Sequence, residues 1–267
     1  MIFNFYIKRN LSKSIFERKI GKYKNTRFKS AINQSDWVLT GTGWSTNHEV
    51  AAIEYALSES KHVVSMIDHW VNYEERFFYD GKKYLPDEIW VTDGIALKQA
   101  KSLFKNLKIR LINNNYVEDL LSEISQYEKC YSTDKSMNIL YICEPMRTDW
   151  GREDEQGEFQ AMRFFFKNLH KMELSAKSNI VLRLHPSEDE KKYDKFLIDN
   201  FSNFRVEKVK NIPLSKQIAQ SDIVVGCQSY ALAIAAQAKK TVISTLPPWA
   251  PECVIPLKNI KHLKKFI

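Results

Sequence analysis

The chain has 267 residues, of which 44% are hydrophobic and 27% charged, a balance that is typical of globular proteins and excludes a largely disordered chain. Its eight glycines and eight prolines are few, which argues against a loop-rich all-β sandwich. The net charge of +8 favours an acidic partner, such as a phosphate compound or an anionic membrane surface. No RRM, KH or helix-turn-helix signature is present, so we expect no nucleic-acid partner.

Hydropathy and the N-terminal residues predict a cytoplasmic protein. No apolar run approaches ~18 residues, the length that predicts a membrane-spanning helix. The first residues place apolar side chains before basic ones, which is the reverse of a secretory signal. The four cysteines form no CxxC pair, and no His/Cys cluster has zinc-ligand spacing, so we expect buried thiols and no metal site.

The first half of the chain predicts alternating strands and helices. The predicted strands are 37–42, 62–68, 88–93 and 109–113, and the predicted helices are 47–58, 95–105 and 117–127. The polar segment 129–136 has no periodicity. It therefore predicts a linker that ends a first domain covering residues 1–128.

A glycine-containing turn follows the first of these strands. Gly41 and Gly43, with Trp44 directly after them, form a Gly-x-Gly turn between a strand and a helix. The turn lacks the third glycine and the downstream acid of a dinucleotide fingerprint, so we expect no NAD binding. The two glycines allow a tight turn and a close approach of another group to the backbone.

Four ionisable side chains of this half lie near the ends of predicted strands. Asp68, His69 and Asp93 lie at strand ends, and Glu49 lies in the first turns of the helix after the strand 37–42. Any of them could take a proton from an acceptor hydroxyl. Asp68 or His69 is the first choice, because they lie at the end of a buried strand, while helix capping or turn formation is the alternative role for each acid.

The second half of the chain restarts the alternation. The predicted strands are 137–143, 179–185, 205–209, 222–227 and 241–245, and the predicted helices are 154–171, 187–200, 213–220 and 229–238. Short strands separated by helices indicate parallel βαβ units. We therefore expect an α/β protein of two Rossmann-like domains, residues 1–128 and 137–267, facing across a cleft. Ligands bind such sheets at the carboxyl ends of their strands.

The loop after the first strand of the second half contains two arginines, Arg147 and Arg152. Either guanidinium could neutralise a diphosphate or a carboxylate. Solvated arginines that flank a helix are an equally good interpretation.

The sequence Arg183-Leu184-His185-Pro186-Ser187 ends the next strand, and Arg183 is a third arginine that we expect at the donor site. Pro186 biases His185 toward extended geometry, which holds the imidazole at the end of the strand. Ser187 and Glu190 have the spacing of a capping box. The imidazole could donate to a phosphate oxygen or protonate a leaving group. Alternatively, His185 satisfies only a neighbouring loop.

A third loop joins the strand 222–227 to a helix of small residues. It contains Gln228, Ser229 and Tyr230. The Ser229 hydroxyl and the first free N–H groups of the helix could bind an anion, although Ser229 can also be a simple helix cap. We expect the two loops to follow neighbouring strands, so that His185 and Ser229 converge on one phosphate.

The sequence RLHP, followed later by QSYALAIAAQAKKTVIS, resembles the donor-binding half of GT-B glycosyltransferases. It is most similar to the sialyltransferase-, polysialyltransferase-, Kdo-transferase- and CDP-glycerol-transferase-like enzymes of bacterial capsule and surface-polysaccharide synthesis. The resemblance covers residues 137–250. It implies that His185, Pro186 and Ser229 contact the phosphate or ribose of a nucleotide-activated donor.

Two departures leave the donor open. Gln228-Ser229 replaces the doubled Ser/Thr of several such families, and Lys239-Lys240-Thr241 replaces a small residue followed by Lys-Pro. A CMP-linked acidic sugar suits the HP motif and the net charge. A UDP-sugar, a CDP-polyol or a phosphoribosyl donor stays open.

These observations predict a metal-independent glycosyltransferase that uses a nucleotide sugar as substrate and needs no cofactor. Its expected partners are a glycan or lipid-linked acceptor and the anionic inner membrane, on which it would lie peripherally. One alternative is a nucleotide-sugar epimerase or hydrolase on the same fold. The other is a non-catalytic GT-B-like binding or scaffold protein, an alternative that the short chain keeps open.

Overall fold

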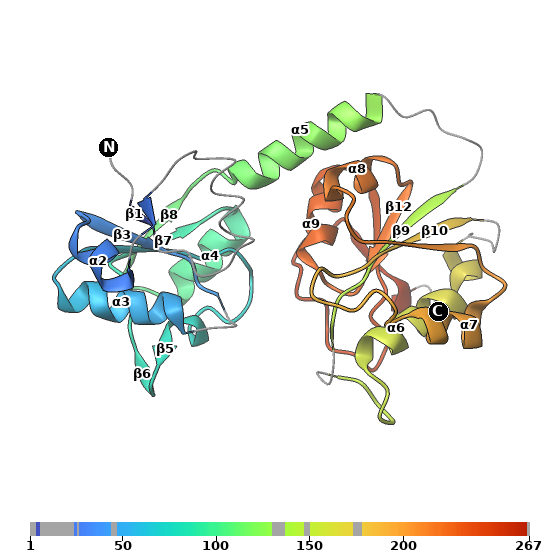
Figure 1. Ribbon diagram of the computed structural model, residues 1–267, viewed down its shortest axis with the longest axis horizontal. Coiled ribbons are helices and arrows are strands. Elements are labelled where there is room, and N and C mark those ends of the chain that lie inside the picture. Colours follow the sequence, from blue (N-terminus) through green and yellow to red (C-terminus); the bar gives the residue numbers. More distant parts are fainter. Residues whose placement is uncertain are drawn as a thin grey trace. The chain divides into compact units, whose positions relative to one another are not determined.

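The computed structural model describes residues 27–43, 47–129, 137–146, 150–172 and 178–265, together with two short parallel strands, β1 (Asn4–Phe5) and β2 (Lys24–Asn25). Its contacts divide the chain into two compact units, Met1–Asn114 and Asn115–Ile267. Each unit contains a parallel β-sheet with helices, as Figure 1 shows. The predicted class, an α/β protein of two Rossmann-like units, is confirmed.

The boundary between the units lies earlier than the expected one. Helix α5 (Asn115–Lys129) packs against helix α8 (Leu214–Ala219), where the Ser215 hydroxyl donates a 2.7 Å hydrogen bond to Glu123. Lys240 forms a 2.7 Å ion pair with Glu128 of the same helix. Helix α5 therefore belongs to the second unit and not to the first. Residue 129 of the predicted linker 129–136 is the last residue of helix α5, and residues 130–136 lie outside the described part of the chain.

The first unit contains a four-stranded parallel sheet in the order β3-β4-β7-β8. Its strands are β3 (Trp37–Thr40), β4 (His62–Met66), β7 (Glu88–Val91) and β8 (Lys108–Leu111). Its helices are α2 (Phe28–Asn33), α3 (His48–Ser58), α4 (Gly94–Leu103) and the 3₁₀ turn Glu75–Phe77, and the hairpin β5 (Phe78–Tyr79) and β6 (Lys82–Lys83) follows that turn. Because right-handed crossovers join strands that lie in sequential order, the helices between them cover one face of this sheet.

The second unit contains a six-stranded parallel sheet in the order β11-β10-β9-β12-β13-β14. The strands are β9 (Asn138–Ile142), β10 (Asn179–Arg183), β11 (Val206–Val209), β12 (Ile223–Gly226), β13 (Thr241–Ser244) and β14 (Ile260–His262). Numbered along the chain, this order is 3-2-1-4-5-6, which defines the Rossmann fold. The order reverses between β9 and β12, so the crevice beyond their carboxyl ends is the expected ligand site.

A glycine permits the close approach of the two central strands. A Cβ atom on Gly226, at the end of β12, would lie 2.8 Å from the carbonyl oxygen of Ile142, at the end of β9. No real side chain tolerates that distance. Gly226 therefore fixes the spacing of the two strands at the point where the strand order reverses.

The helices of the second unit cover its sheet with a dense aromatic core. Besides α5 and α8, they are α6 (Gly157–Lys167), α7 (Asp194–Phe201), α9 (Tyr230–Gln237) and the 3₁₀ turns Leu169–Met172 and Leu263–Lys265. Phe164, Phe165 and Phe166 of α6 are buried. Among the described residues, no helix is both long and apolar enough to cross a membrane.

Candidate functional site

Three loops of the second unit follow adjacent strands at the carboxyl edge of its sheet. Glu144 follows β9, His185 follows β10 and Ser229 follows β12. The prediction that His185 and Ser229 follow neighbouring strands is wrong, because β9 lies between β10 and β12. Strands in a sheet lie about 4.8 Å apart, so these two strand ends are separated by about 10 Å. This span suits a nucleotide better than one phosphate group.

The start of helix α9 is organised by a carboxylate from the neighbouring strand. The backbone N–H of Gln228 donates a 2.9 Å hydrogen bond to Oε2 of Glu144, and the Gln228 side chain accepts one from the N–H of Val254 at 3.3 Å. Ser229 is the N-cap, and its hydroxyl oxygen accepts a 3.4 Å bond from the N–H of Ala231. A carboxylate in this position accepts hydrogen bonds from hydroxyl groups and repels phosphate.

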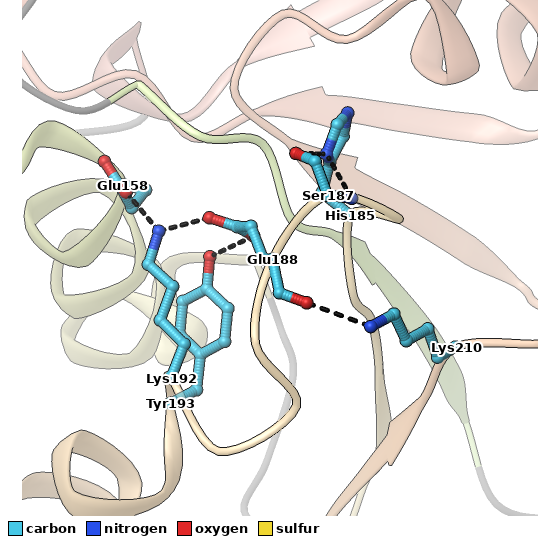
Figure 2. Close-up of polar contacts among 7 residues, drawn as sticks. All are labelled: Glu158, His185, Ser187, Glu188, Lys192, Tyr193 and Lys210. Carbon is cyan, nitrogen blue, oxygen red and sulfur yellow. Dashed lines mark hydrogen bonds and ion pairs between the residues drawn. The ribbon is translucent and has the colours of Figure 1, made fainter. Parts of the chain in front are cut away.

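The ring of His185 is held by the residue two positions later. Its Nδ1 lies 2.7 Å from the hydroxyl of Ser187 and accepts the backbone N–H of Ser187 at 3.2 Å, as Figure 2 shows. Because Nδ1 accepts a hydrogen bond, the neutral ring carries its proton on Nε2. His185 therefore presents an N–H donor, the form that binds a phosphate oxygen.

The capping box predicted for this loop is wrong. Helix α7 begins at Asp194 and not at residue 187, and its N-cap is Tyr193. The Ser187 hydroxyl is bonded to the His185 ring, and residues 186–188 and 190–193 form turns and a bend. Ser187 therefore supports the imidazole instead of starting a helix.

A buried network of charges anchors the loop that carries His185 (Figure 2). The ammonium group of Lys192 contacts the carboxylates of Glu158 and Glu188, and the Tyr193 hydroxyl donates a 3.2 Å bond to Glu188. Lys210 donates a 2.9 Å bond to the Glu188 carbonyl. Burial alone would lower the pKa of Lys192, but its bonds to the two carboxylates outweigh burial and raise it. The network ties the His185 loop to helix α6 and to strand β11.

The predicted arginines differ in their surroundings. Arg183 donates a 2.6 Å bond to the carbonyl of Ile212 and a second bond to the Gln217 side chain, and burial lowers its pKa. These bonds direct Arg183 toward helix α8. The Arg152 guanidinium lies 5.6 Å from the ring centre of Trp249. Arg147 lies outside the described residues.

The remaining predicted residues of this edge lie in the same two loops. Pro186 is exposed between His185 and Ser187, and Tyr230 is the half-buried first residue of helix α9. The second unit thus brings together two groups of predicted residues, His185-Pro186-Ser187 and Gln228-Ser229-Tyr230, on either side of Glu144.

In the first unit, a buried arginine organises the carboxyl edge of the sheet. The Arg76 side chain is only 5% exposed and donates hydrogen bonds to the Thr42 carbonyl at 2.6 Å and to Asp68 at 3.2 Å. It also bonds the Val71 carbonyl at 3.1 Å, and the Thr42 hydroxyl donates to the Met66 carbonyl at 3.0 Å. Arg76 thereby fixes the glycine turn to the loop that carries Asp68.

Asp93 acts as a helix cap. Its Oδ1 accepts the N–H groups of Ile95 and Ala96, both at 2.8 Å, and its Oδ2 accepts the indole N–H of Trp70 at 2.9 Å. Both carboxylate oxygens are therefore engaged within the unit. Asp93 therefore caps a helix, which was the alternative role predicted for the acidic residues.

Burial shifts the ionisation of two neighbouring rings. Desolvation by burial, with the charge of Arg76, lowers the pKa of His69 below 6.5 against the opposing effect of Asp68. The His69 ring lies edge-on to Trp70, with ring centres 5.4 Å apart. Burial and then the charge of Asp93 raise the pKa of Tyr73 to about 12. His69 is therefore neutral at pH 7.

Glu49 lies over the glycine turn. Its Oε1 is 3.9 Å from the position of a Cβ on Gly41 and 3.1 Å from that on Gly43. Its Oε2 is buried and has no hydrogen-bond partner in the described part of the chain. Trp44, predicted to lie beside these glycines, is outside the described residues.

The sequence interpretation missed three residues of these edges: Arg76, Glu144 and Lys192. Glu144 follows a buried strand directly, the same signal that singled out His185. Arg76 and Lys192 lie in segments without such a signal, and only tertiary contacts show their roles. No group of three or more His, Cys, Asp or Glu side chains among the residues described here is arranged to hold a metal ion.

Comparisons with known proteins support the fold. No protein-family model and no curated protein matches the sequence. A protein assigned as a UDP-N-acetylglucosamine 2-epimerase from Listeria monocytogenes is similar in structure, with a TM-score of 0.57 and 14% identity over 87% of this chain and 68% of that one. This likeness shows a GT-B fold of two Rossmann-like units.

Two other solved structures are less similar. MurG from Acinetobacter baumannii has a TM-score of 0.49 and 11% identity, over 89% of this chain and 63% of that one. The Kdo transferase KpsC from Thermosulfurimonas dismutans has a TM-score of 0.37 and 14% identity, over 100% of this chain and 88% of that one. The chain thus spans less than two thirds of the length of MurG.

Proposed function

We propose that this chain is a glycosyltransferase that moves a sugar from a nucleotide-activated donor to a glycan or lipid-linked acceptor of a bacterial surface. One observation carries the proposal. Three adjacent strands of a Rossmann-ordered sheet present an N–H-donating imidazole, a carboxylate and a capped helix start at the edge where such sheets bind nucleotides.

Each of these groups suits a different part of the donor. The Nε2–H of His185 donates to a phosphate oxygen, and Glu144 accepts hydrogen bonds from ribose hydroxyls. The start of helix α9 at Ser229 favours partial negative charge. Arg152, with Pro186, Ser187, Gln228 and Tyr230, completes the proposed donor site. A CMP-linked acidic sugar is our first choice of donor.

The chemistry requires stabilisation of a leaving group. When the bond between the sugar and the phosphate breaks, negative charge develops on the phosphate oxygen. A preorganised donor such as the His185 N–H stabilises this charge more in the transition state than in the bound donor, and that difference accelerates the reaction. The proposed reaction needs neither a metal ion nor an organic cofactor.

The variant His185→Ala tests the proposal. We expect it to weaken CMP or UDP affinity, or to lower kcat/KM, by at least about tenfold, which corresponds to about 1.4 kcal/mol. His170→Ala is the matched control, because His170 is an exposed histidine of the same unit outside the three loops. Calorimetry and turnover that are the same for both variants and the unaltered chain would contradict the donor site.

A further inference from the structure

We propose that Arg183 and Gln217 form a second anion subsite, which binds an anionic group of the donor other than the phosphate at His185. The group is an oxyanion, either a second phosphate or the carboxylate of an acidic sugar. This inference rests on the proposed glycosyltransferase function and names the class of donor, which is one with two anionic groups. All three residues belong to the second unit.

The guanidinium of Arg183 is partly buried and has no carboxylate partner. Its Nη1 donates to the Ile212 carbonyl at 2.6 Å and to the Gln217 side chain, and both of these acceptors are neutral. A guanidinium has five N–H donors, and Arg183 has no further partner in the described part of the chain. The described residues therefore leave its positive charge without a counter-charge.

Two other partly buried cations of the second unit are neutralised. Lys192 contacts two carboxylates, and Lys240 pairs with Glu128 at 2.7 Å. Burial acts against the charge of both Lys192 and Arg183. The carboxylates reverse this effect and raise the pKa of Lys192, whereas the pKa of Arg183 stays lowered. A partly buried charge without a partner destabilises a fold, and a bound anion supplies the partner.

Gln217 has an unused donor beside this guanidinium. It lies in helix α8 and is only 5% exposed. Because a guanidinium only donates, the atom that faces Arg183 is Oε1, which leaves Nε2 as the amide donor. Nε2 is buried and has no hydrogen-bond partner among the described residues, although native proteins satisfy nearly all such atoms. An oxyanion beside Arg183 accepts from the amide and from the guanidinium together.

Arg183 and His185 lie on the same face of strand β10 and its extension. Burial alternates along this segment, because Leu182 and Leu184 are 0% and 3% exposed while Arg183 and His185 are partly exposed. Side chains two residues apart in an extended chain point to the same face and begin about 7 Å apart. One donor can therefore contact His185 with its first phosphate and Arg183 with its second anionic group.

Glu144 favours this arrangement from the neighbouring strand. The register pairs Arg183 of β10 with Ile142 of β9, two residues before Glu144. The carboxylate of Glu144 repels anions and accepts hydrogen bonds from hydroxyl groups. It therefore favours the ribose beside β9 and the anionic groups beside β10.

Calorimetry with ligands that carry one or two anionic groups tests the subsite. CMP and UMP carry one phosphate, CDP and UDP carry a second, and a CMP-linked acidic sugar carries a carboxylate. We expect the diphosphates or the sugar nucleotide to bind the unaltered chain at least about tenfold more tightly than the corresponding monophosphate. A gain with the diphosphates identifies the second group as a phosphate, and a gain with the sugar nucleotide identifies it as a carboxylate.

Two variants assign this gain to the subsite. Arg183→Met should reduce the gain to within about twofold and leave monophosphate affinity unchanged. Arg205→Met is the matched control, because Arg205 is an exposed arginine of the same unit. Gln217→Glu keeps the shape of the side chain and places a carboxylate beside Arg183. It should abolish the gain and raise the urea midpoint of the ligand-free chain, because the guanidinium then has a partner.

The outcomes separate this inference from the proposed function. If no ligand with two anionic groups shows a gain, or if both variants retain it, the subsite is overturned and the nucleotide site at His185 stays in place. An absence of nucleotide binding by the unaltered chain would overturn both. If Arg183→Met does not fold, Gln217→Glu decides: loss of the gain in a stabilised variant supports the subsite, and a retained gain overturns it.

Discussion

Replacement of Lys192 by Met tests how the His185 loop is held. The substitution keeps an apolar stem of similar length but removes the ammonium group between Glu158 and Glu188, whose side chains are only 3% and 6% exposed. Two buried carboxylates would then face each other without a cation. Removing one partner of a buried ion pair destabilises a protein by about 3–5 kcal/mol, and we expect a loss of that size.

The assay is urea unfolding followed by circular dichroism, with Lys195→Met as the control because Lys195 is an exposed residue of the same segment. At an m-value of about 2 kcal/mol/M, the unfolding midpoint of Lys192→Met should fall by about 2 M. The double variant Glu158→Gln/Lys192→Met should recover part of the loss, since one buried charge is removed. A loss below about 1 kcal/mol, or no recovery, would refute the reasoning.

The pH dependence of this effect follows from the raised pKa of Lys192. A lysine whose folded-state pKa lies above its ordinary value of 10.5 stabilises the protein fully below that value, and the contribution is lost as the pH rises through the folded-state pKa. The difference between the unaltered chain and Lys192→Met should therefore stay constant from about pH 7 to about pH 9. A difference that shrinks within this range would show that another group controls the network.

Two further predictions concern the first unit and the surface. Because burial lowers the pKa of His69 below 6.5, the neutral ring contributes stability that is present above pH 6.5 and lost as the pH falls toward the folded-state pKa. His69→Gln should flatten this acid limb in thermal melts recorded between about pH 6.5 and about pH 5, and parallel curves would contradict it. The net charge of +8 and the exposed Phe78 and Lys82 of the β5–β6 hairpin predict binding to anionic vesicles that weakens with salt, at about 1 kcal/mol for each nearby basic residue. Co-sedimentation that depends on neither anionic lipid nor salt would exclude membrane association.

The sequence predicted the strands well because their apolar runs are short and are bounded by polar residues. The sequence pattern does not determine the order of the strands, because βαβ units of the same pattern can be added on either side of a sheet. The insertion of β9 between β10 and β12 is therefore visible only in the structure. The same limit applies to helix α5, because an amphipathic pattern shows that a helix packs but not which unit it packs against.

The side-chain roles were harder to predict than the strands. Ser187 has the spacing of a helix cap, but its hydroxyl bonds the His185 ring, and a short-range pattern does not distinguish these two partners. Asp68 and Asp93 occupy equivalent places after strands, yet Arg76 and Trp70, which engage them, come from other parts of the chain. What separates Glu49 from both is the absence of a described partner on one buried oxygen, a property of the fold.

The most direct test of the proposed function is product analysis with the full chain. The chain is incubated with CMP-, UDP- and CDP-activated donors and a surface-glycan acceptor, and the products are identified by mass spectrometry. A glycosyltransferase produces an acceptor extended by one sugar and an equal amount of free nucleotide, and His185→Ala should reduce both together. Free sugar without an extended acceptor, an epimerised nucleotide sugar, or unchanged donor with every substrate would contradict the account.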